Sequence, residues 1–135
     1  MSMNLGDIFK KFYSKKDKEW YSISDEDKEL SFFIFNRYLS KKYVDKAQFF
    51  NSNKEFIDKA LCMDIWYEFM KTQPYPSWFW SKPKSSEKSK ITNKEFISLQ
   101  KHLQMKDIDL KYLIDNYFDF VKEELKYLKK LEKQN

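Results

Sequence analysis

The sequence has 135 residues and contains one glycine, three prolines and one cysteine. The shortage of glycine leaves few positions for the tight turns of β-hairpins, so it favours helices over strands. The single cysteine, Cys62, excludes an intramolecular disulfide and fits a reducing location. No apolar run approaches the roughly 20 residues that span a bilayer, and residues 1–16 lack the apolar core of a signal peptide. We therefore expect an intracellular protein that does not enter a membrane.

The common motifs of enzyme chemistry are missing as well. The sequence contains no P-loop, no dinucleotide-binding G-x-G-x-x-G, no H-E-x-x-H, no C-x-x-C and no serine elbow. The only histidine, His102, has no nucleophile or metal ligand at a motif spacing, so catalysis by this residue has no support. We predict no catalytic residues, no metal site and no cofactor.

The residues that are abundant indicate a packed, basic domain. Hydrophobic residues make up 41% of the sequence and aromatic residues 19%, which excludes wholesale disorder. Lys and Arg number 26 against 21 Asp and Glu, for a formal net charge of +5. This balance is compatible with an anionic partner, either a nucleic acid or an acidic protein.

Helical spacing predicts an all-α fold, a compact single-domain bundle of about five to seven helices. We expect residues 1–23 to form a short amphipathic N-terminal segment and residues 24–135 to form the helical domain. In the N-terminal segment, a helix over residues 3–16 either docks on this domain or on a partner, and a polar linker follows at Lys16–Ser22. Its inward side chains are Leu5, Ile8, Phe9 and Phe12.

Capping signals place the later helices. Ser24 is expected to cap a helix that runs to about Leu39, and Thr92 with Glu95 forms a capping box for another helix. Apolar spacing predicts further helices over Tyr43–Phe50, Glu55–Lys71, the residues after Asp107, and Phe118–Lys133. The predicted inward residues of these segments include Val44, Phe56 and Leu61.

The helix after Ser24 is expected to be the centre of the fold. Its apolar residues surround almost the whole helix, since Leu30 and Phe33 add a second apolar side, so burial against several neighbours is predicted. Arg37, the only arginine, falls in that second side. Its guanidinium must meet a carboxylate or carbonyl, or reach the surface.

One segment, residues 73–90, is neither periodic nor plainly disordered. It holds all three prolines, a run of aromatic residues and several lysines. One interpretation is a binding loop in which Trp78, Trp80, Lys82 and Lys84 contact DNA or a protein partner. The alternative is a loop whose tryptophans plug the core and whose lysines form a linker.

The order of these motifs resembles the small, non-ATPase subunit of bacteriophage sliding-clamp loaders, the A-subunit family of T-even-type loaders. The resemblance covers about Phe32–Lys130. It rests on an Asn-Arg-x-Leu-Ser stretch, a Tyr-x-Phe helix, a Trp-x-Lys loop and a terminal Tyr-Leu-Lys-Lys. The matching residues are Asn36, Arg37, Leu39, Ser40, Tyr67, Phe69, Trp80, Lys82, Tyr127, Leu128, Lys129 and Lys130.

The resemblance implies a subunit that has no ATPase site of its own and completes a ring with AAA+ ATPase large subunits. It would help to open the sliding clamp and load it on primer–template DNA in the host cytoplasm during infection. Trp78, Trp80, Lys82 and Lys84 would then bind DNA or the clamp. Interface or structural roles would fall to Asn36, Arg37, Ser40, Tyr67 and Phe69. The alternative is a stand-alone small helical protein that binds nucleic acid or regulates another protein.

Overall fold

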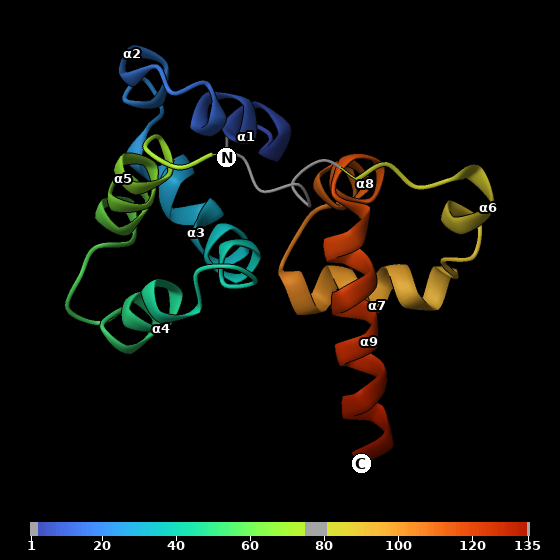
Figure 1. The fold of residues 1–135 in the computed structure, drawn as a ribbon. Helices are drawn as coiled ribbons and strands as arrows, with labels where there is room; N and C mark the ends of the chain where they lie inside the picture. The colour runs from blue at the N-terminus through green and yellow to red at the C-terminus, as the bar shows by residue number, and fades with distance from the viewer. Residues whose placement is uncertain (1–2, 75–80, 135) are drawn as a thin grey trace. The chain divides into compact units, whose positions relative to one another are not determined.

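The computed structural model describes residues 3–74 and 81–134, and these ranges are helical without any extended strand (Figure 1). This confirms the all-α prediction. The described ranges contain nine helices, more than the five to seven expected, because two short helices have four residues each. The helices are α1 (Leu5–Tyr13), α2 (Asp17–Trp20), α3 (Asp25–Leu39), α4 (Val44–Ser52), α5 (Lys59–Met70), α6 (Ser85–Lys88), α7 (Asn93–Leu103), α8 (Asp107–Asn116) and α9 (Phe118–Gln134).

The chain folds as two compact units, Met1–Pro74 and Tyr75–Asn135, where the sequence led us to expect one bundle. The first unit contains α1–α5 and the second contains α6–α9. The predicted N-terminal segment, residues 1–23, belongs to the first unit. The division after Pro74 falls inside the segment of residues 73–90, ahead of its run of aromatic residues.

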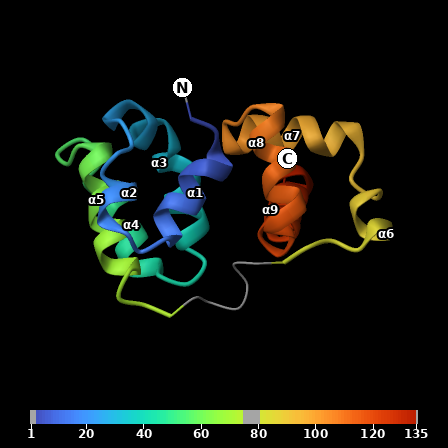
Figure 2. The same ribbon diagram turned by 90° about the horizontal axis from the view of Figure 1, so that it is seen from above.

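In the first unit α3 lies against α4 and α5, and α1 adds aromatic rings to the same core (Figures 1 and 2). The Phe9 and Phe12 rings lie 4.4 Å and 5.0 Å from the Phe35 ring, measured between centroids. All four predicted inward residues of α1 are buried. The N-terminal helix therefore docks on its own unit.

Two predicted caps are confirmed. The Ser24 hydroxyl accepts a hydrogen bond from the Asp27 amide at 3.1 Å, and the Thr92 hydroxyl accepts one from the Glu95 amide at 3.1 Å. The start of α5 was predicted too early. Asp58 accepts from the Ala60 amide, so α5 begins at Lys59.

Several residues predicted to point inward are exposed. Phe56 lies in the turn before α5 and is 84% exposed, because the helix does not extend back to it. On α3, Leu30 is 57% and Phe33 is 38% exposed, so burial on every side of this helix was a wrong expectation. The buried side of α3 faces α1, α4 and α5 instead. Val44 and Leu61 are also exposed.

The predicted linker at Lys16–Ser22 is in fact the short helix α2, whose Trp20 is fully buried. Lys15 precedes this helix with φ of 61°, and Gln104 ends α7 with φ of 57°. Both residues occupy the left-handed region that glycine adopts most easily.

In the second unit α7, α8 and α9 pack against one another (Figures 1 and 2). The apolar side chains whose spacing predicted α9 become progressively more exposed along the helix. Val121 is buried, Leu125 and Leu128 are half-buried, and Leu131 is exposed. Figure 1 shows the reason, since the C-terminal turns of α9 extend past α7.

A buried amide joins the three main helices of the first unit. Asn36 of α3 is 3% exposed, and its Nδ2 donates to the Ala47 carbonyl and to Asn51 Oδ1 on α4, each at 3.2 Å. Its Oδ1 accepts from Trp66 Nε1 on α5 at 3.0 Å. Polar groups this deeply buried must be hydrogen-bonded, so one side chain fixes α4 and α5 in position against α3.

We predict that Asn36→Ala lowers the free energy of unfolding by about 3 kcal/mol, because it leaves the indole N–H of Trp66 and the carbonyl of Ala47 buried without this partner. Urea denaturation measures the loss. Asn53→Ala is the matched control, since Asn53 makes one exposed side-chain hydrogen bond, to the Phe49 carbonyl. A loss no larger than that of the control would contradict the central role of Asn36.

Candidate functional site

Ser81 is the first described residue of the candidate binding loop after Pro74. Ser81 forms an isolated bridge with Tyr117, between α8 and α9. Its amide donates to the Asn116 carbonyl at 3.1 Å, its carbonyl accepts from the Phe118 amide at 2.9 Å, and its hydroxyl accepts from the Asp119 amide at 2.8 Å. The end of the loop is therefore fixed to the start of α9. Trp78 and Trp80 lie outside the described residues.

Lys82 and Lys84 follow this anchor directly, and both side chains are exposed. Neither forms an ion pair with a described acidic residue. The neighbouring lysines do form them, since Lys88 Nζ lies 2.5 Å from Asp115 Oδ1 and Lys122 Nζ lies 3.6 Å from Glu87 Oε2. Lys82 and Lys84 are thus positioned as solvent-facing charges beside the start of α9.

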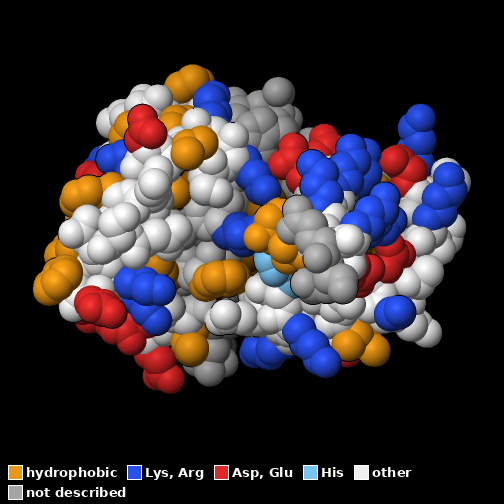
Figure 3. Space-filling view, turned by 90° about the horizontal axis from the view of Figure 1, so that it is seen from below, with side chains coloured by type: hydrophobic (Ala, Val, Ile, Leu, Met, Phe, Trp, Pro, Cys, Tyr) orange, Lys and Arg blue, Asp and Glu red, His pale blue; other side chains and the backbone are white. Residues whose placement is uncertain are grey.

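The positive charge of the chain is concentrated in the second unit. Residues 75–135 contain 13 lysines and 9 acidic residues, a formal net charge of +4. Residues 1–74 contain 13 basic and 12 acidic residues, a net charge of +1. Figure 3, which looks toward the C-terminal end of α9, shows lysine side chains gathered beside it.

Two residues of the Asn-Arg-x-Leu-Ser stretch lie at the end of α3. Arg37 is half-buried, with part of its side chain reaching the surface, as one of the sequence-based alternatives allowed. Ser40 caps the helix by donating its hydroxyl to the Arg37 carbonyl at 2.5 Å. The stretch therefore contains Asn36, whose buried amide joins three helices, and Ser40, which ends α3.

The Tyr-x-Phe pair separates into a buried and a half-buried aromatic. Tyr67 is fully buried and stacks on Trp20, with centroids 5.2 Å apart and ring planes 8° from parallel. Phe69 is half-buried, and the Lys46 ammonium lies 4.6 Å from its ring centroid. Tyr67 supports the core, whereas Phe69 retains an accessible edge.

A charged cluster around Trp20 was not predicted from the sequence. Lys28 of α3 is 3% exposed, and its Nζ lies 2.7 Å from Asp64 Oδ1 of α5. The same oxygen accepts from Trp20 Nε1 at 2.9 Å. Lys28 Nζ also lies 5.0 Å from the Trp20 ring centroid. The cluster joins α2, α3 and α5. The apolar spacing around Trp20 did not indicate that this residue is buried, so the sequence did not predict the cluster.

A second, exposed network holds α2 on α5. The Tyr67 hydroxyl donates to Asp17 Oδ1 at 2.7 Å, and Lys71 Nζ pairs with the same oxygen at 3.1 Å and with Glu68 at 2.7 Å. The Tyr67 hydrogen bond and the Lys71 ammonium lower the pKa of the Asp17 carboxyl. Hydrogen bonds from Lys71 and Tyr21 lower the pKa of the Glu68 carboxyl.

The only histidine lies beside a buried carboxylate, and the only cysteine is buried in the core. His102 Nε2 of α7 lies 3.5 Å from Glu124 Oε2 of α9, and Glu124 is fully buried. The Cys62 thiol is also buried, and burial raises its pKa, so it is protonated at neutral pH. Cys62 therefore packs as a small hydrophobe.

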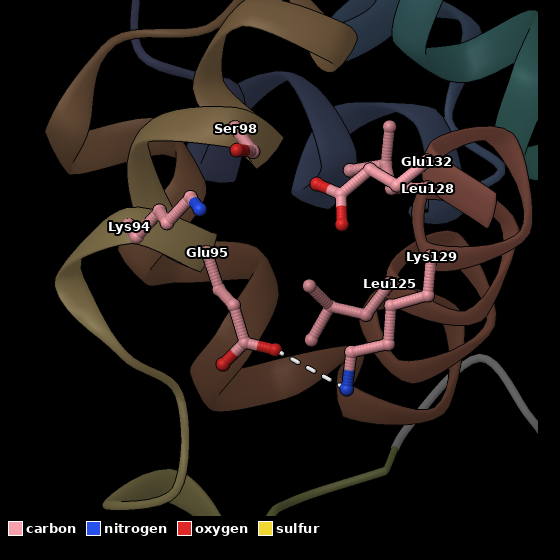
Figure 4. A pocket seen from close by; sticks show the side chains of 7 residues that line it. All are labelled: Lys94, Glu95, Ser98, Leu125, Leu128, Lys129 and Glu132. Carbon is pink, nitrogen blue, oxygen red and sulfur yellow. Dashed lines mark ion pairs between the residues drawn. The ribbon is translucent and has the colours of Figure 1, made fainter. Parts of the chain in front are cut away.

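A shallow groove of about 100 Å³ lies between α7 and α9. Figure 4 shows two leucines of α9 on its floor and an ion pair across it, with Lys129 Nζ 3.4 Å from Glu95 Oε2. Its lining residues are Lys94, Glu95, Ser98, Leu125, Leu128, Lys129 and Glu132. The groove is small and mostly polar at its rim, which does not fit a cofactor-sized ligand.

Within residues 3–74 and 81–134, no three His, Cys, Asp or Glu side chains come together in a way that could hold a metal ion. Over the same ranges, no helix combines the length and the apolar character needed to cross a membrane.

The exposed network on α2 gives a prediction for acid stability. The pKa values of Asp17 and Glu68 are lowered in the folded state. The two ionised carboxylates therefore stabilise the folded state fully at pH values above their ordinary pKa values of 3.8 and 4.5. This stabilisation is lost as the pH falls through the lowered values. We expect Asp17→Asn with Glu68→Gln to reduce the urea midpoint at pH 7 and to flatten its decrease between about pH 5 and pH 3.

Glu55→Gln is the control, since Glu55 is exposed and forms no ion pair with a described residue. Its urea midpoint should follow the wild-type protein across this pH range. If the double variant decreased as steeply as the wild-type protein below pH 5, the network would not be a source of acid sensitivity.

No protein-family model matches this sequence, and comparisons with curated proteins and with solved structures return no match.

Proposed function

We propose that this protein is a non-catalytic subunit of a phage sliding-clamp loader, which assembles with AAA+ ATPase subunits and helps to load the clamp on primer–template DNA. The observation that carries the proposal is the Asn-Arg-x-Leu-Ser stretch at the end of α3. Its asparagine is the buried amide that joins α3, α4 and α5. A motif shared with the clamp-loader family thus coincides with the main hydrogen-bonded junction of the first unit.

Exposed apolar side chains of the first unit support a role in assembly. Leu30 and Phe33 lie three residues apart on α3, so they share one helix face, and both are exposed. Phe56 is exposed in the turn before α5. Neighbouring exposed apolar side chains, such as Leu30 and Phe33, are typical of surfaces that another protein covers. In this proposal the first unit contacts the ATPase subunits.

The second unit supplies the contact with DNA in this proposal. Its formal charge of +4 favours approach to a polyanion. Lys82 and Lys84 are exposed beside the fixed end of the loop at Ser81. Lysine side chains on a fixed backbone position contact phosphates without reading base sequence.

A second candidate function is that of a stand-alone helical protein that binds nucleic acid. The observation that favours it is the same concentration of charge, which needs no ATPase partner. The two candidates differ in one measurable property, since only the clamp-loader subunit must form a stable complex with an AAA+ ATPase.

The assembly test is co-expression with an AAA+ ATPase large subunit of a phage clamp loader, followed by size-exclusion chromatography. We expect one complex at micromolar concentration, and ATP turnover that the clamp and primed DNA stimulate. Trp80→Ala should keep the complex but reduce the stimulated turnover, because tryptophans contribute strongly to interfaces. Phe49→Ala, which removes an exposed aromatic of α4 that has no part in the proposed contacts, is its control. Separate elution, with turnover that ignores this chain, would exclude the clamp-loader function.

The loop test measures DNA affinity. Lys82→Ala with Lys84→Ala should weaken binding equally for all sequences and reduce the slope of log K against log salt by about 1 to 2, as the loss of two phosphate contacts predicts. Lys54→Ala with Lys59→Ala removes the same charge from exposed positions of the first unit and should leave binding unchanged. An unaltered salt slope in the folded loop variant would rule out DNA contact by these two lysines.

A further inference from the structure

The outer side of α9 carries a continuous face of lysines. At 100° per residue, its five lysines fall within an arc of about 100°, and every residue of α9 in that arc from Lys122 onward is a lysine. All five are exposed. This lysine face consists of Lys122, Lys126, Lys129, Lys130 and Lys133.

Ion pairs account for only part of the lysine face. Lys122 pairs with Glu87 and Asp119, and Lys129 pairs with Glu95. The other three lysines form no ion pair with any residue in the described part of the chain. These three, Lys126, Lys130 and Lys133, follow one another at steps of four and three residues along the same side of the helix.

Helix stability does not require this arrangement. The helix dipole favours cations only within about the last turn, and Lys126 lies two turns before Gln134. Lysines three or four residues apart repel each other, at a cost of about 0.2–0.5 kcal/mol per pair. The C-terminal turns also extend past α7, so the lysine face does not cover the core of the unit (Figure 1).

We propose that the lysine face of α9 binds the phosphate backbone of DNA and is the main contact of this chain with the primer–template duplex. The inference rests on the proposed function and names the surface that would meet DNA. With a rise of 1.5 Å per residue, Lys126 to Lys133 spans about 10.5 Å, a length over which one DNA strand presents about three phosphates at an axial rise of 3.4 Å each. Flexible ammonium groups at this spacing can contact successive phosphates.

Two features favour a phosphate backbone over an acidic protein. The arc contains no apolar side chain, whereas protein interfaces depend on aromatic or aliphatic anchors at their centre. The exposed apolar residues of α9, Tyr127 and Leu131, lie outside the arc. The lysine face also begins where Lys122 meets α6, so it continues from the segment that carries Lys82 and Lys84.

The test compares two triple variants of the full-length chain. Lys126→Gln, Lys130→Gln and Lys133→Gln together neutralise the lysines of the face that form no ion pair. The matched control changes Lys101, Lys106 and Lys111 to Gln, which removes the same charge from other exposed positions of the second unit. Circular dichroism checks that both variants fold. Fluorescence anisotropy with a labelled duplex of random sequence measures affinity over a series of salt concentrations.

We expect the face variant to lose more than about tenfold in affinity at low salt and to reduce the slope of log K against log salt by about 2 to 3, while the control stays close to the wild-type protein. Equal losses in both variants, unchanged binding in the face variant, or no DNA binding by the wild-type chain would each overturn the proposal. So would displacement of the DNA by polyglutamate at equal charge, which would indicate an acidic protein as the ligand.

The co-elution of wild-type and variant chains with the ATPase is measured in parallel. If the face variant still joins the ATPase complex and binds DNA normally, the lysine face is excluded while the assembly function stands. If the wild-type chain does not join that complex, the clamp-loader function is excluded whatever the DNA result.

Discussion

The first unit depends on the hydrogen bonds of one buried amide. The hydrophobic effect is non-directional, whereas Asn36 offers two donors and an acceptor that only one arrangement satisfies. With α5 held in this register, Asp64 lies within reach of Lys28, and Tyr67 within reach of Asp17. The polar clusters at the α2 end of the unit therefore follow from the junction at Asn36.

Sequence patterns correctly predicted the features that depend on local interactions, such as helix caps. The caps at Ser24 and Thr92 depend on a few neighbouring residues, and both were found. The inward face of α1 was also correct. The errors concern tertiary structure: an apolar run on α3 shows that a face could be buried, but not whether another helix covers it. Leu30 and Phe33 stayed exposed, and Trp20, placed in a linker, lies in the core.

For the candidate site, the sequence identified lysines but not their surroundings. It singled out Lys82 and Lys84, and the anchoring of Ser81 at the start of α9 could not be predicted, because it joins residues more than 30 positions apart. The two units also divide the chemistry. The first has nearly balanced charge and more of the exposed large apolar side chains among the described residues, whereas the second has most of the excess charge. Assembly and DNA contact are thus proposed for different units.

Lys15 and Gln104 adopt the left-handed backbone conformation in a chain that has only one glycine. Each holds a side chain in a conformation that costs about 1–2 kcal/mol for residues other than glycine. Neither residue belongs to the buried core. Replacement of Lys15 or Gln104 by glycine or asparagine is therefore expected to increase the thermal stability of the protein. Relatives that work at higher temperature would be the first in which to look for such changes.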